Sequence, residues 1–505
     1  MAVYLADDPE AGREPVIAIV GGGASGTLAA TYVLREAASR RMPLRVALID
    51  RHGRHGLGQA YSTTHPAHLL NSPAGAMSAL AGDPGHLARW AAGAGLPDDG
   101  FLPRGAYGRY LAEFLTAAER SAWPAARVSR ITAAVVTIRR CSHGRALRLH
   151  LAADGRIDAD AVVLATGNLP PVVPCPVPAG RYVADPWEPG ALDGVADGSP
   201  VAVLGTGLTM LDTAITLTGA HPRTTVHAIS RHGLLPREHR WPRPAAAMSA
   251  LPVIRRTGGT LRLTRLIRDV RVGAAAYPGD WQDVVDALRP QIPGLWEQLP
   301  EADQRLFLRH VARYWEVHRH RVPPETALRA AALTSAGRLS VHRGRLAAVS
   351  DQPDGLRVRI DHGGSSAELT AGWLVNCTGP ASDITATAHP LLRQLLDAGL
   401  ARPDPLRLGL DTGPRGAVRD ALGRPASDIF ALGPLLRGSR YETTAIPEIR
   451  DQAAALARHL LDRQGNARPG SAALPASACD RKHSIRVSAV MITLVWGWLG
   501  LLPVP

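Results

Sequence analysis

The chain has 505 residues, of which 46% are hydrophobic and 20% charged, so it can bury large cores and is expected to form at least two domains. Its net charge is +13, but the basic residues, all arginine except Lys482, are scattered among acids, which argues against a nucleic-acid partner. The four cysteines are far apart and form no C-x-x-C pair. We therefore expect no metal site, no disulfide framework and no redox dithiol, and a cytoplasmic setting.

The first functional motif is a glycine-rich turn. It follows the apolar run 16–20, which is typical of a central parallel strand. A helical pattern and a second strand at 44–49 come next. In such a βαβ unit the glycines permit a tight turn, close approach of a pyrophosphate and packing of the helix. The alternative is a glycine-rich loop with only a structural role. We predict a dinucleotide site, with an acid facing the adenosine ribose, formed by Gly21, Gly23, Ala24, Ser25, Gly26, Asp50 and Arg51.

The same order of elements, a glycine turn, a hairpin and then an apolar strand, occurs in both halves of the chain. Amphipathic strands around 134–139 and 146–151 indicate a hairpin, and an apolar strand then ends at Ala165-Thr166-Gly167. Strand 201–204 leads to a second glycine turn, and a hairpin around Asp354-Gly355 precedes another apolar strand that ends before Gly379. The repetition predicts two nested dinucleotide-binding domains.

The second turn keeps Gly205 and Gly207 but has Met210 where a third glycine would stand. Binding of a dinucleotide is still expected, because the retained glycines are the two nearest the phosphates. The strand that follows ends at Ser230-Arg231 instead of an acid. A hydroxyl and a guanidinium would bind a 2′-phosphate that a carboxylate would repel, so we predict NADPH over NADH. The alternative for Arg231 is a solvated surface side chain.

Residues 261–332 show helical spacing and few strand signals, which predicts a helical subdomain. The segment 315–321 concentrates hydrogen-bond donors, as either an anion clamp or a basic solvated helix face. An acidic substrate would need paired arginines, which Arg319 with Arg321 or Arg440 could supply. The apolar run 487–502 is short for a spanning helix. It is a membrane anchor or interfacial segment, a segment docked on the body, or an end produced by a change of reading frame.

Ordered blocks across residues 14–460 resemble one protein family. They are Ile17–Ala30, Gly58–Ser62, His68–Ala74, Met77-Ser78, Phe101–Leu111, Ala165–Pro171, Gly205–Asp212, Ser230–Arg237 and Trp315–Arg321. Together they resemble the FAD/NAD(P)-binding flavoprotein monooxygenases, a family that includes a bacterial FAD-dependent urate hydroxylase and the aspartate N-monooxygenases that form nitrosuccinate. The resemblance implies FAD in the first site and NADPH in the second. It also implies reaction of the reduced flavin with dioxygen, and oxygen transfer to a small-molecule substrate through a C4a-hydroperoxyflavin.

The resemblance also implies positions close to the flavin. Thr166 and Gly167 would lie against the flavin nucleotide, and a helix beginning at Ile446 would point its N-terminus at the ring. Asn71 is the catalytic candidate, through a hydrogen bond near the isoalloxazine; its alternative role is to cap the loop before Pro73.

The expected fold is α/β, with two nested Rossmann-like domains of the flavin-monooxygenase kind and a helical subdomain. The expected divisions are an FAD-binding domain at 14–200 and 340–465, an NADP-binding domain at 201–260, a helical subdomain at 261–339, and a linker with an apolar tail at 466–505. The expected activity is NADPH-consuming hydroxylation of a nitrogen or an activated carbon in a small polar metabolite. The alternatives are an FAD-dependent NAD(P)H dehydrogenase or reductase without oxygen transfer, and a membrane-tethered redox sensor.

Overall fold

A computed structural model describes residues 14–142, 145–173, 175–178, 180–242 and 260–466. The first domain is built on a six-stranded sheet, in which β17 pairs antiparallel with the edge strand β16 and the other neighbours are parallel. In sheet order the strands are β16 (Ala417–Arg419), β17 (Pro425–Ala431), β7 (Ala161–Leu164), β1 (Val16–Val20), β2 (Leu44–Asp50) and β3 (Ala126–Thr132). Strand β1 is apolar at every position because both faces of the sheet are covered.

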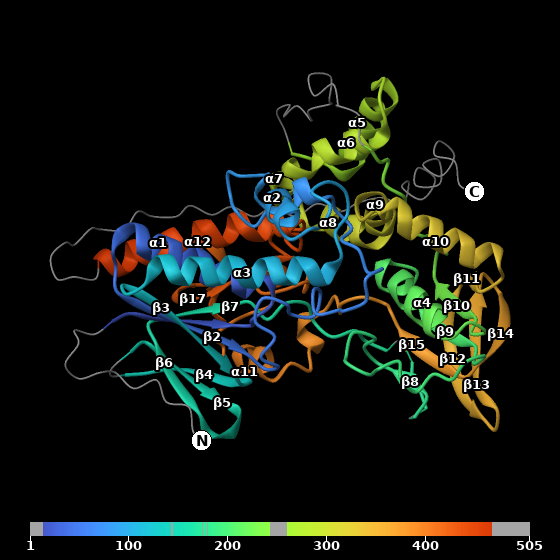
Figure 1. The fold of residues 1–505 in the computed structure, drawn as a ribbon, viewed down its shortest axis with the longest axis horizontal. Coiled ribbons are helices and arrows are strands. Elements are labelled where there is room, and N and C mark those ends of the chain that lie inside the picture. Colours follow the sequence, from blue (N-terminus) through green and yellow to red (C-terminus); the bar gives the residue numbers. More distant parts are fainter. Residues whose placement is uncertain (1–13, 143–144, 174, 179, 243–259, 467–505) are drawn as a thin grey trace.

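Three helices lie side by side on one face of this sheet (Figure 1). They are α1 (Ala24–Arg40), α3 (Arg104–Ala122) and α12 (Ile446–Asn466). The other face is covered by a small antiparallel sheet and one helix, which enclose a second apolar core. These elements are β4 (Val135–Arg140), β5 (Leu147–Leu151), β6 (Arg156–Ala159) and α11 (Pro390–Asp397). The hairpin expected near residues 134–151 is therefore present and covers the sheet.

The second domain repeats this plan around a five-stranded parallel sheet. In sheet order its strands are β11 (Leu339–Arg343), β10 (Val226–Ser230), β9 (Val201–Leu204), β15 (Trp373–Asn376) and β8 (Tyr182–Val183). One face packs against α4 (Leu208–Ala220) and α10 (Pro324–Ser335), and the other against the antiparallel sheet β12 (Arg345–Gln352), β13 (Gly355–His362) and β14 (Ser365–Ala371). The expected α/β class with two nested Rossmann-like units is confirmed.

Helices inserted between β10 and β11 form the expected helical subdomain (Figure 1). They are α5 (Leu263–Ala276), α6 (Trp281–Leu288), α7 (Ile292–Gln298), α8 (Glu301–Leu306), a π-helical turn (Phe307–Val311) and α9 (Ala312–Arg319). Helix α2 (His86–Gly93) belongs to the first domain.

The division between the domains differs from the one expected at residue 340. Strands β11 to β15, residues 339–376, belong to the second domain, because β11 and β15 pair with β10 and β9. Helix α10 also packs on the second domain rather than on the helical subdomain. The second domain is thus an insertion in the first, entered before β8 and left after β15. The apolar run 487–502 lies outside the described residues; within them, no helix combines the length and apolar character needed to span a bilayer.

Candidate functional site: two glycine turns joined by a domain interface

The first glycine turn connects β1 to α1, and two of its glycines, Gly21 and Gly26, leave no room for a side chain. Gly21 has a φ of +109°, and a Cβ there would overlap the carbonyl oxygen of Ala165. A Cβ at Gly26 would overlap the carbonyl oxygen of Gly21, so the helix can begin this close to the strand only with glycine. Gly23 has more room, with the nearest atom, the Cα of Gly58, 3.5 Å from its hypothetical Cβ.

The N-terminus of α1, which begins with Ala24 and Ser25, is open to a ligand. No side chain caps it, and no acid lies in its first turn. Its first N–H groups therefore lack the partners that a helix end normally acquires, and an anion would be stabilised there by both hydrogen bonds and the helix dipole. A pyrophosphate fits this position beside Gly23.

Asp50 lies at the end of β2, where its carboxylate shapes the turn. It accepts hydrogen bonds from the backbone N–H groups of Gly22 at 3.0 Å, His52 at 2.9 Å and Arg54 at 3.1 Å. Burial raises the pKa of Asp50, but the three backbone donors outweigh burial, and the pKa lies below its ordinary value. The carboxylate is therefore ionised at neutral pH, as an acceptor for ribose hydroxyls must be. The neighbouring Arg51 is exposed.

Thr166 and Gly167 follow β7, next to the first glycine turn. The hydroxyl oxygen of Thr166 is buried and has no hydrogen-bond partner among the described residues. Gly167 has a φ of +76°, and no atom lies within 4 Å of a hypothetical Cβ there. A buried hydroxyl without a partner is unusual in a native protein. A bound group that accepts its hydrogen bond explains it.

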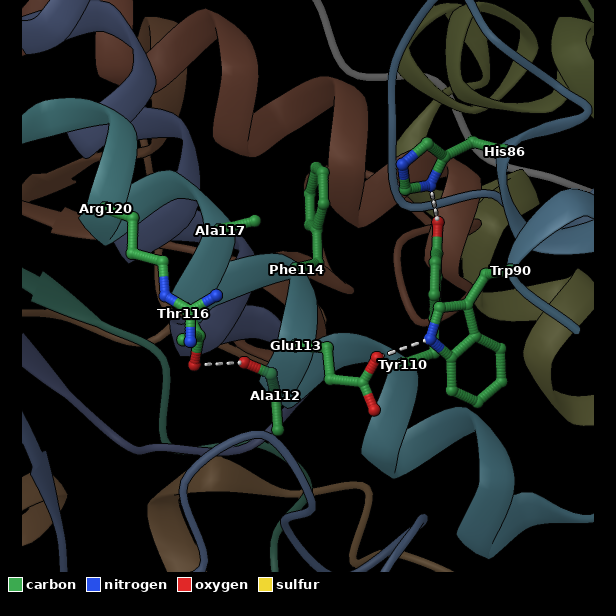
Figure 2. A pocket seen from close by; sticks show the side chains of 9 residues that line it. All are labelled: His86, Trp90, Tyr110, Ala112, Glu113, Phe114, Thr116, Ala117 and Arg120. Carbon is green, nitrogen blue, oxygen red and sulfur yellow. Dashed lines mark hydrogen bonds between the residues drawn. The ribbon is translucent and has the colours of Figure 1, made fainter. Parts of the chain in front are cut away.

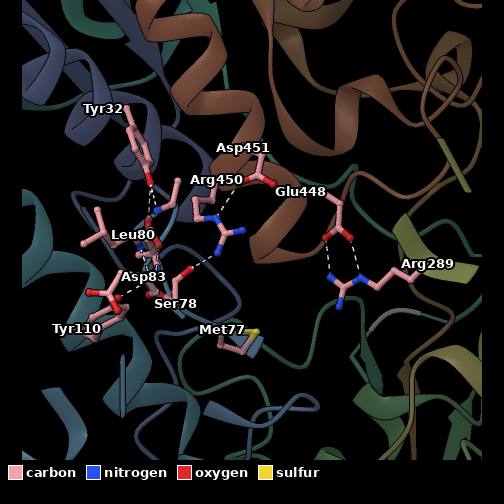
Figure 3. A network of polar contacts seen from close by, with 12 residues as sticks. Tyr32, Met77, Ser78, Leu80, Asp83, Tyr110, Arg289, Glu448, Arg450 and Asp451 are labelled. Atoms are coloured by element: carbon pink, nitrogen blue, oxygen red, sulfur yellow. Dashed lines mark hydrogen bonds and ion pairs between the residues drawn. The ribbon is translucent and has the colours of Figure 1, made fainter. Parts of the chain in front are cut away.

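Ile446, the first residue of α12, is buried in the core shared with α1. Its side chain is committed to packing, so a ligand could meet only the backbone of this helix end. The first turn of α12 carries Glu448, which accepts two hydrogen bonds from Arg289, at 2.7 and 2.6 Å (Figure 3). Arg289 comes from the helical subdomain, so this ion pair fixes the subdomain against the helix end. Arg450, two residues further on, donates to the carbonyl of Ser78 at 3.1 Å and ties the 77–83 loop to the same helix.

The second glycine turn reproduces the geometry of the first. Gly205 has a φ of +104°, and a Cβ there would overlap the carbonyl oxygen of Cys377. Cys377 directly follows β15, as Ala165 directly follows β7 in the first domain. Gly207 has no neighbouring atom within 4 Å of a hypothetical Cβ, and no side chain caps α4. Met210, in the place of the third glycine, is fully buried in the core of the second domain. The two glycines nearest a phosphate are thus retained, and Gly207 has open space beside it among the described residues.

The end of β10 presents hydroxyl and basic groups. The Ser230 hydroxyl lies 2.9 Å from that of Thr206 and accepts a hydrogen bond from the backbone of Gly233 at 3.1 Å. Arg231 is exposed and forms no ion pair among the described residues. Arg313 of α9 donates to the Thr206 hydroxyl at 3.2 Å. This contact was missed from the sequence because α9 is far from the turn along the chain.

Asn71 lies in a loop of the first domain that contacts the second. His239 donates a hydrogen bond to its backbone carbonyl at 3.0 Å, and its half-buried side chain makes no hydrogen bond with the described residues. The amide is thus available to a ligand. Its expected role near a flavin stays a prediction.

The same loop is held by an interface with α4 that the sequence did not reveal. His68 lies 2.9 Å from the hydroxyl of Thr216, and the guanidinium of Arg104 lies 2.9 Å from the carboxylate of Asp212. Burial lowers the pKa of His68 to about 4 and raises that of Asp212 to about 6, the latter against the opposing charge of Arg104. His68 and Asp212 lie in blocks that carry the family resemblance, but their spacing in the sequence does not predict that the loop and α4 are in contact.

The arginines expected to bind an acidic substrate, Arg319 with Arg321 or Arg440, have different surroundings. Arg319 is 5% exposed and lies 3.4 Å from the Glu442 carboxylate, while its Nε and Nη2 atoms have no hydrogen-bond partner among the described residues. Arg321 is paired with Asp286 of α6 and lies over the ring of Trp281. Arg440 is half-buried. Residues two apart at a helix end point in different directions, which is why Arg321 has a separate partner.

A surface hollow of about 550 Å³ lies between α2 and α3 (Figure 2). It is lined by His86, Trp90, Tyr110, Ala112, Glu113, Phe114, Thr116, Ala117 and Arg120. None of the residues described above lines it, and the hydrogen bonds of His86 to Tyr110 and of Trp90 to Glu113 use its main polar groups internally. We assign it no role in the site. No cluster of potential metal ligands occurs in the part of the chain that the structure describes.

Comparison with known proteins gives a match to a family model and matches to solved structures. Residues 18–169 match a protein-family model described as FAD-NAD(P)-binding. The ornithine hydroxylase from Pseudomonas aeruginosa shares 14% identity and a TM-score of 0.59 over 88% of this chain and 99% of its own. The ornithine N-hydroxylase from Kutzneria sp. 744, solved with reduced FAD, NADP⁺ and L-ornithine, shares 16% identity and a TM-score of 0.57, over 90% and 100%.

A third solved structure is the FAD-bound cadaverine monooxygenase of desferrioxamine biosynthesis from Erwinia amylovora, with 14% identity and a TM-score of 0.59 over 93% of this chain and 99% of that one. No curated protein sequence matches the chain. The chain therefore has the fold of these N-hydroxylating monooxygenases, and its first domain carries the FAD-NAD(P)-binding match.

Proposed function

We propose that this protein is an FAD-dependent, NADPH-consuming monooxygenase that hydroxylates a nitrogen, or an activated carbon, of a small polar metabolite. The observation that carries the proposal is the pair of equivalent glycine turns, in which the glycine before the helix, Gly23 or Gly207, leaves room for a ligand and no side chain of the described residues caps the helix. Two such turns in one chain suit a permanently bound dinucleotide and a second one that reduces it. The likeness in fold to N-hydroxylases over nearly the whole chain favours oxygen transfer to nitrogen.

The first turn supplies the residues to hold FAD. Gly23 and the N-terminus of α1 would receive the pyrophosphate, Asp50 the ribose hydroxyls, and the Thr166 hydroxyl would donate the hydrogen bond that it lacks within the protein. When bound, FAD would accept the hydride of NADPH and activate dioxygen. The protein contributes binding, orientation and exclusion of water.

The second turn would hold NADPH, with Gly207 at its pyrophosphate and Ser230 and Arg231 at the 2′-phosphate. The contacts of His68 with Thr216 and of Arg104 with Asp212 would fix the second domain against the first, so that the two cofactors meet in one orientation. The Asn71 amide, which makes no hydrogen bond with the described residues, would be the polar group offered near the reacting atoms.

For the substrate, we propose a molecule with a carboxylate, such as an amino acid. Arg319 supports this because, within the described residues, its buried Nε has no partner and its Nη2 has only the 3.4 Å ion pair with Glu442, which is costly unless a ligand completes the hydrogen bonds. Arg440 is the arginine that could assist it, since Arg321 is occupied by Asp286. Aspartate, as in the nitrosuccinate-forming enzymes that the sequence resembles, fits this chemistry.

The test begins with the purified full-length chain. We expect a yellow protein with a flavin spectrum that oxidises NADPH faster than NADH. Aspartate, urate, ornithine, lysine and cadaverine would be added in turn under ¹⁸O₂, with peroxide release measured alongside. Incorporation of one ¹⁸O atom into a product, with little peroxide, would establish the monooxygenase. Flavin reduction with no labelled product from any compound would favour the reductase alternative, and a colourless protein after reconstitution would refute the proposal.

A further inference from the structure

We infer that Arg343 and Arg313, together with Arg231, bind the 2′-phosphate of NADPH and set the preference for NADPH over NADH. This inference rests on the proposed function, since it concerns the nucleotide of the second turn. The sequence alone indicated only Ser230 and Arg231 at this position. Of the other two arginines, Arg343 comes from β11, the edge strand beside β10, and Arg313 from the helical subdomain.

The internal repeat locates Arg343. In the first domain, Asp50 at the end of β2 pairs in register with Thr132 at the end of β3. In the second domain, Ser230 at the end of β10 pairs in register with Arg343 at the end of β11. The position that would meet the adenosine ribose is thus Asp50 with a neighbouring threonine in the first domain, and Ser230 with a neighbouring arginine in the second. This exchange suits a hydroxyl-bearing ribose at the first site and a phosphorylated ribose at the second.

Arg313 reaches the same place from α9. Its guanidinium donates to the Thr206 hydroxyl at 3.2 Å and to the Leu234 carbonyl at 3.4 Å, and the Thr206 hydroxyl in turn lies 2.9 Å from that of Ser230. These contacts hold the guanidinium between the glycine turn and the end of β10. Its one ion pair among the described residues is a loose one, with Glu316 at 3.7 Å, so it keeps the capacity to bind an anion.

The electrostatics at this edge agree with the geometry. His232 has a lowered pKa, first because of burial and then because Arg231, Arg313 and Arg343 lie close to it. Arg231 and Arg343 are exposed and have no ion pair in the described part of the chain, although most other arginines do. Two guanidinium groups without a carboxylate partner, beside a third whose ion pair with Glu316 is loose, attract a dianionic phosphate.

The experiment compares two probes, 2′,5′-ADP and 5′-AMP, which differ only in the 2′-phosphate, by calorimetry on the FAD-loaded protein. We expect Arg343→Gln to raise the Kd of 2′,5′-ADP at least tenfold and to leave that of 5′-AMP unchanged. Arg313→Gln should act in the same direction. The matched control is Arg345→Gln, which removes an exposed arginine two residues further along the chain.

The outcomes separate this inference from the proposed function. If the parent protein binds both probes equally, or if Arg343→Gln behaves as Arg345→Gln does, the inference is wrong even when FAD is bound and NADPH is oxidised. If the protein holds no flavin, the proposed function itself fails. Selective loss of 2′,5′-ADP affinity in Arg343→Gln, with flavin content and melting temperature retained, would establish the site.

Discussion

The replacement of Gly207 by alanine separates nucleotide binding from folding. Gly207 has a φ of −89° and a ψ of −166°, an extended conformation that alanine adopts without strain. No atom of the described chain beyond its immediate neighbours lies within 4 Å of the added methyl group. The protein itself should therefore accommodate the substitution, whereas a pyrophosphate that approaches the backbone at this point would not.

The expected magnitudes follow from these two facts. Alanine is a poorer helix N-cap than glycine, but it also restricts the unfolded chain, so the net change in the free energy of unfolding should stay within about 1 kcal/mol. Forcing a methyl group into a packed contact costs about 1–3 kcal/mol. The Kd of NADPH should therefore rise by about 5- to 150-fold.

The assay measures the Kd of NADPH by calorimetry, with flavin content and melting temperature followed in parallel. Gly219→Ala is the matched control, because Gly219 lies in the same helix and also has no atom within 4 Å of its hypothetical Cβ. We expect Gly219→Ala to leave the affinity unchanged. Unaltered NADPH affinity in Gly207→Ala would refute the assignment of this turn to the nucleotide. A large fall in melting temperature would refute the account of its packing.

Three further predictions concern stability. Gly26→Ala should yield a colourless and less stable protein, measured by flavin absorbance and thermal unfolding, because its Cβ would overlap the carbonyl oxygen of Gly21. His68 has a folded pKa of about 4, below its ordinary 6.5. The unfolded chain therefore takes up a proton on this imidazole before the folded protein does, and stability falls as the pH is lowered from 6.5 to 4. Over that interval the free energy of unfolding of the wild type, measured in urea, should fall by about 2 kcal/mol more than that of His68→Gln. Arg319→Gln should cost about 3–5 kcal/mol by leaving the buried Glu442 carboxylate without its cation, with the Trp315 indole N–H as its remaining donor, and the double variant with Glu442→Gln should recover most of this loss.

The parts of the fold that depend on local sequence were predictable. The apolar runs of β1 and β9 and the glycines that follow them specify strand, turn and helix within a few residues of one another. The hairpins at β4–β5 and β12–β13 are specified by alternating side chains and short turns. These elements were sufficient to predict the nested α/β architecture.

Membership of a sheet was not predictable in the same way. Strands β8 and β15 pair although nearly 200 residues separate them along the chain, and short apolar strands do not specify their partners. The position of β11 beside β10 likewise depends on the helical subdomain that intervenes. For this reason the predicted division at residue 340 was wrong.

The candidate site shows the same distinction. The glycines were found because their steric requirements are local, and Asp50 because it ends the next strand. The contacts of Arg313 with Thr206 and of Arg104 with Asp212 join elements from different parts of the chain, so no spacing in the sequence reveals them. Arg319 and Arg321 show the converse. They are two residues apart in sequence but pair with different carboxylates, Glu442 and Asp286, and their role toward a substrate stays a prediction.

The insertion of one domain within the other has a consequence for how such a chain can be re-engineered or diversified. The outgoing and returning segments run together, and the N–H of Ala381 donates to the carbonyl of Pro170 at 3.3 Å. Cutting there and splicing the flanks through a few residues would leave the first domain topologically whole. Any exchange of the inserted segment would also replace the helical subdomain, so the nucleotide site, Arg289 and Arg319 would change together.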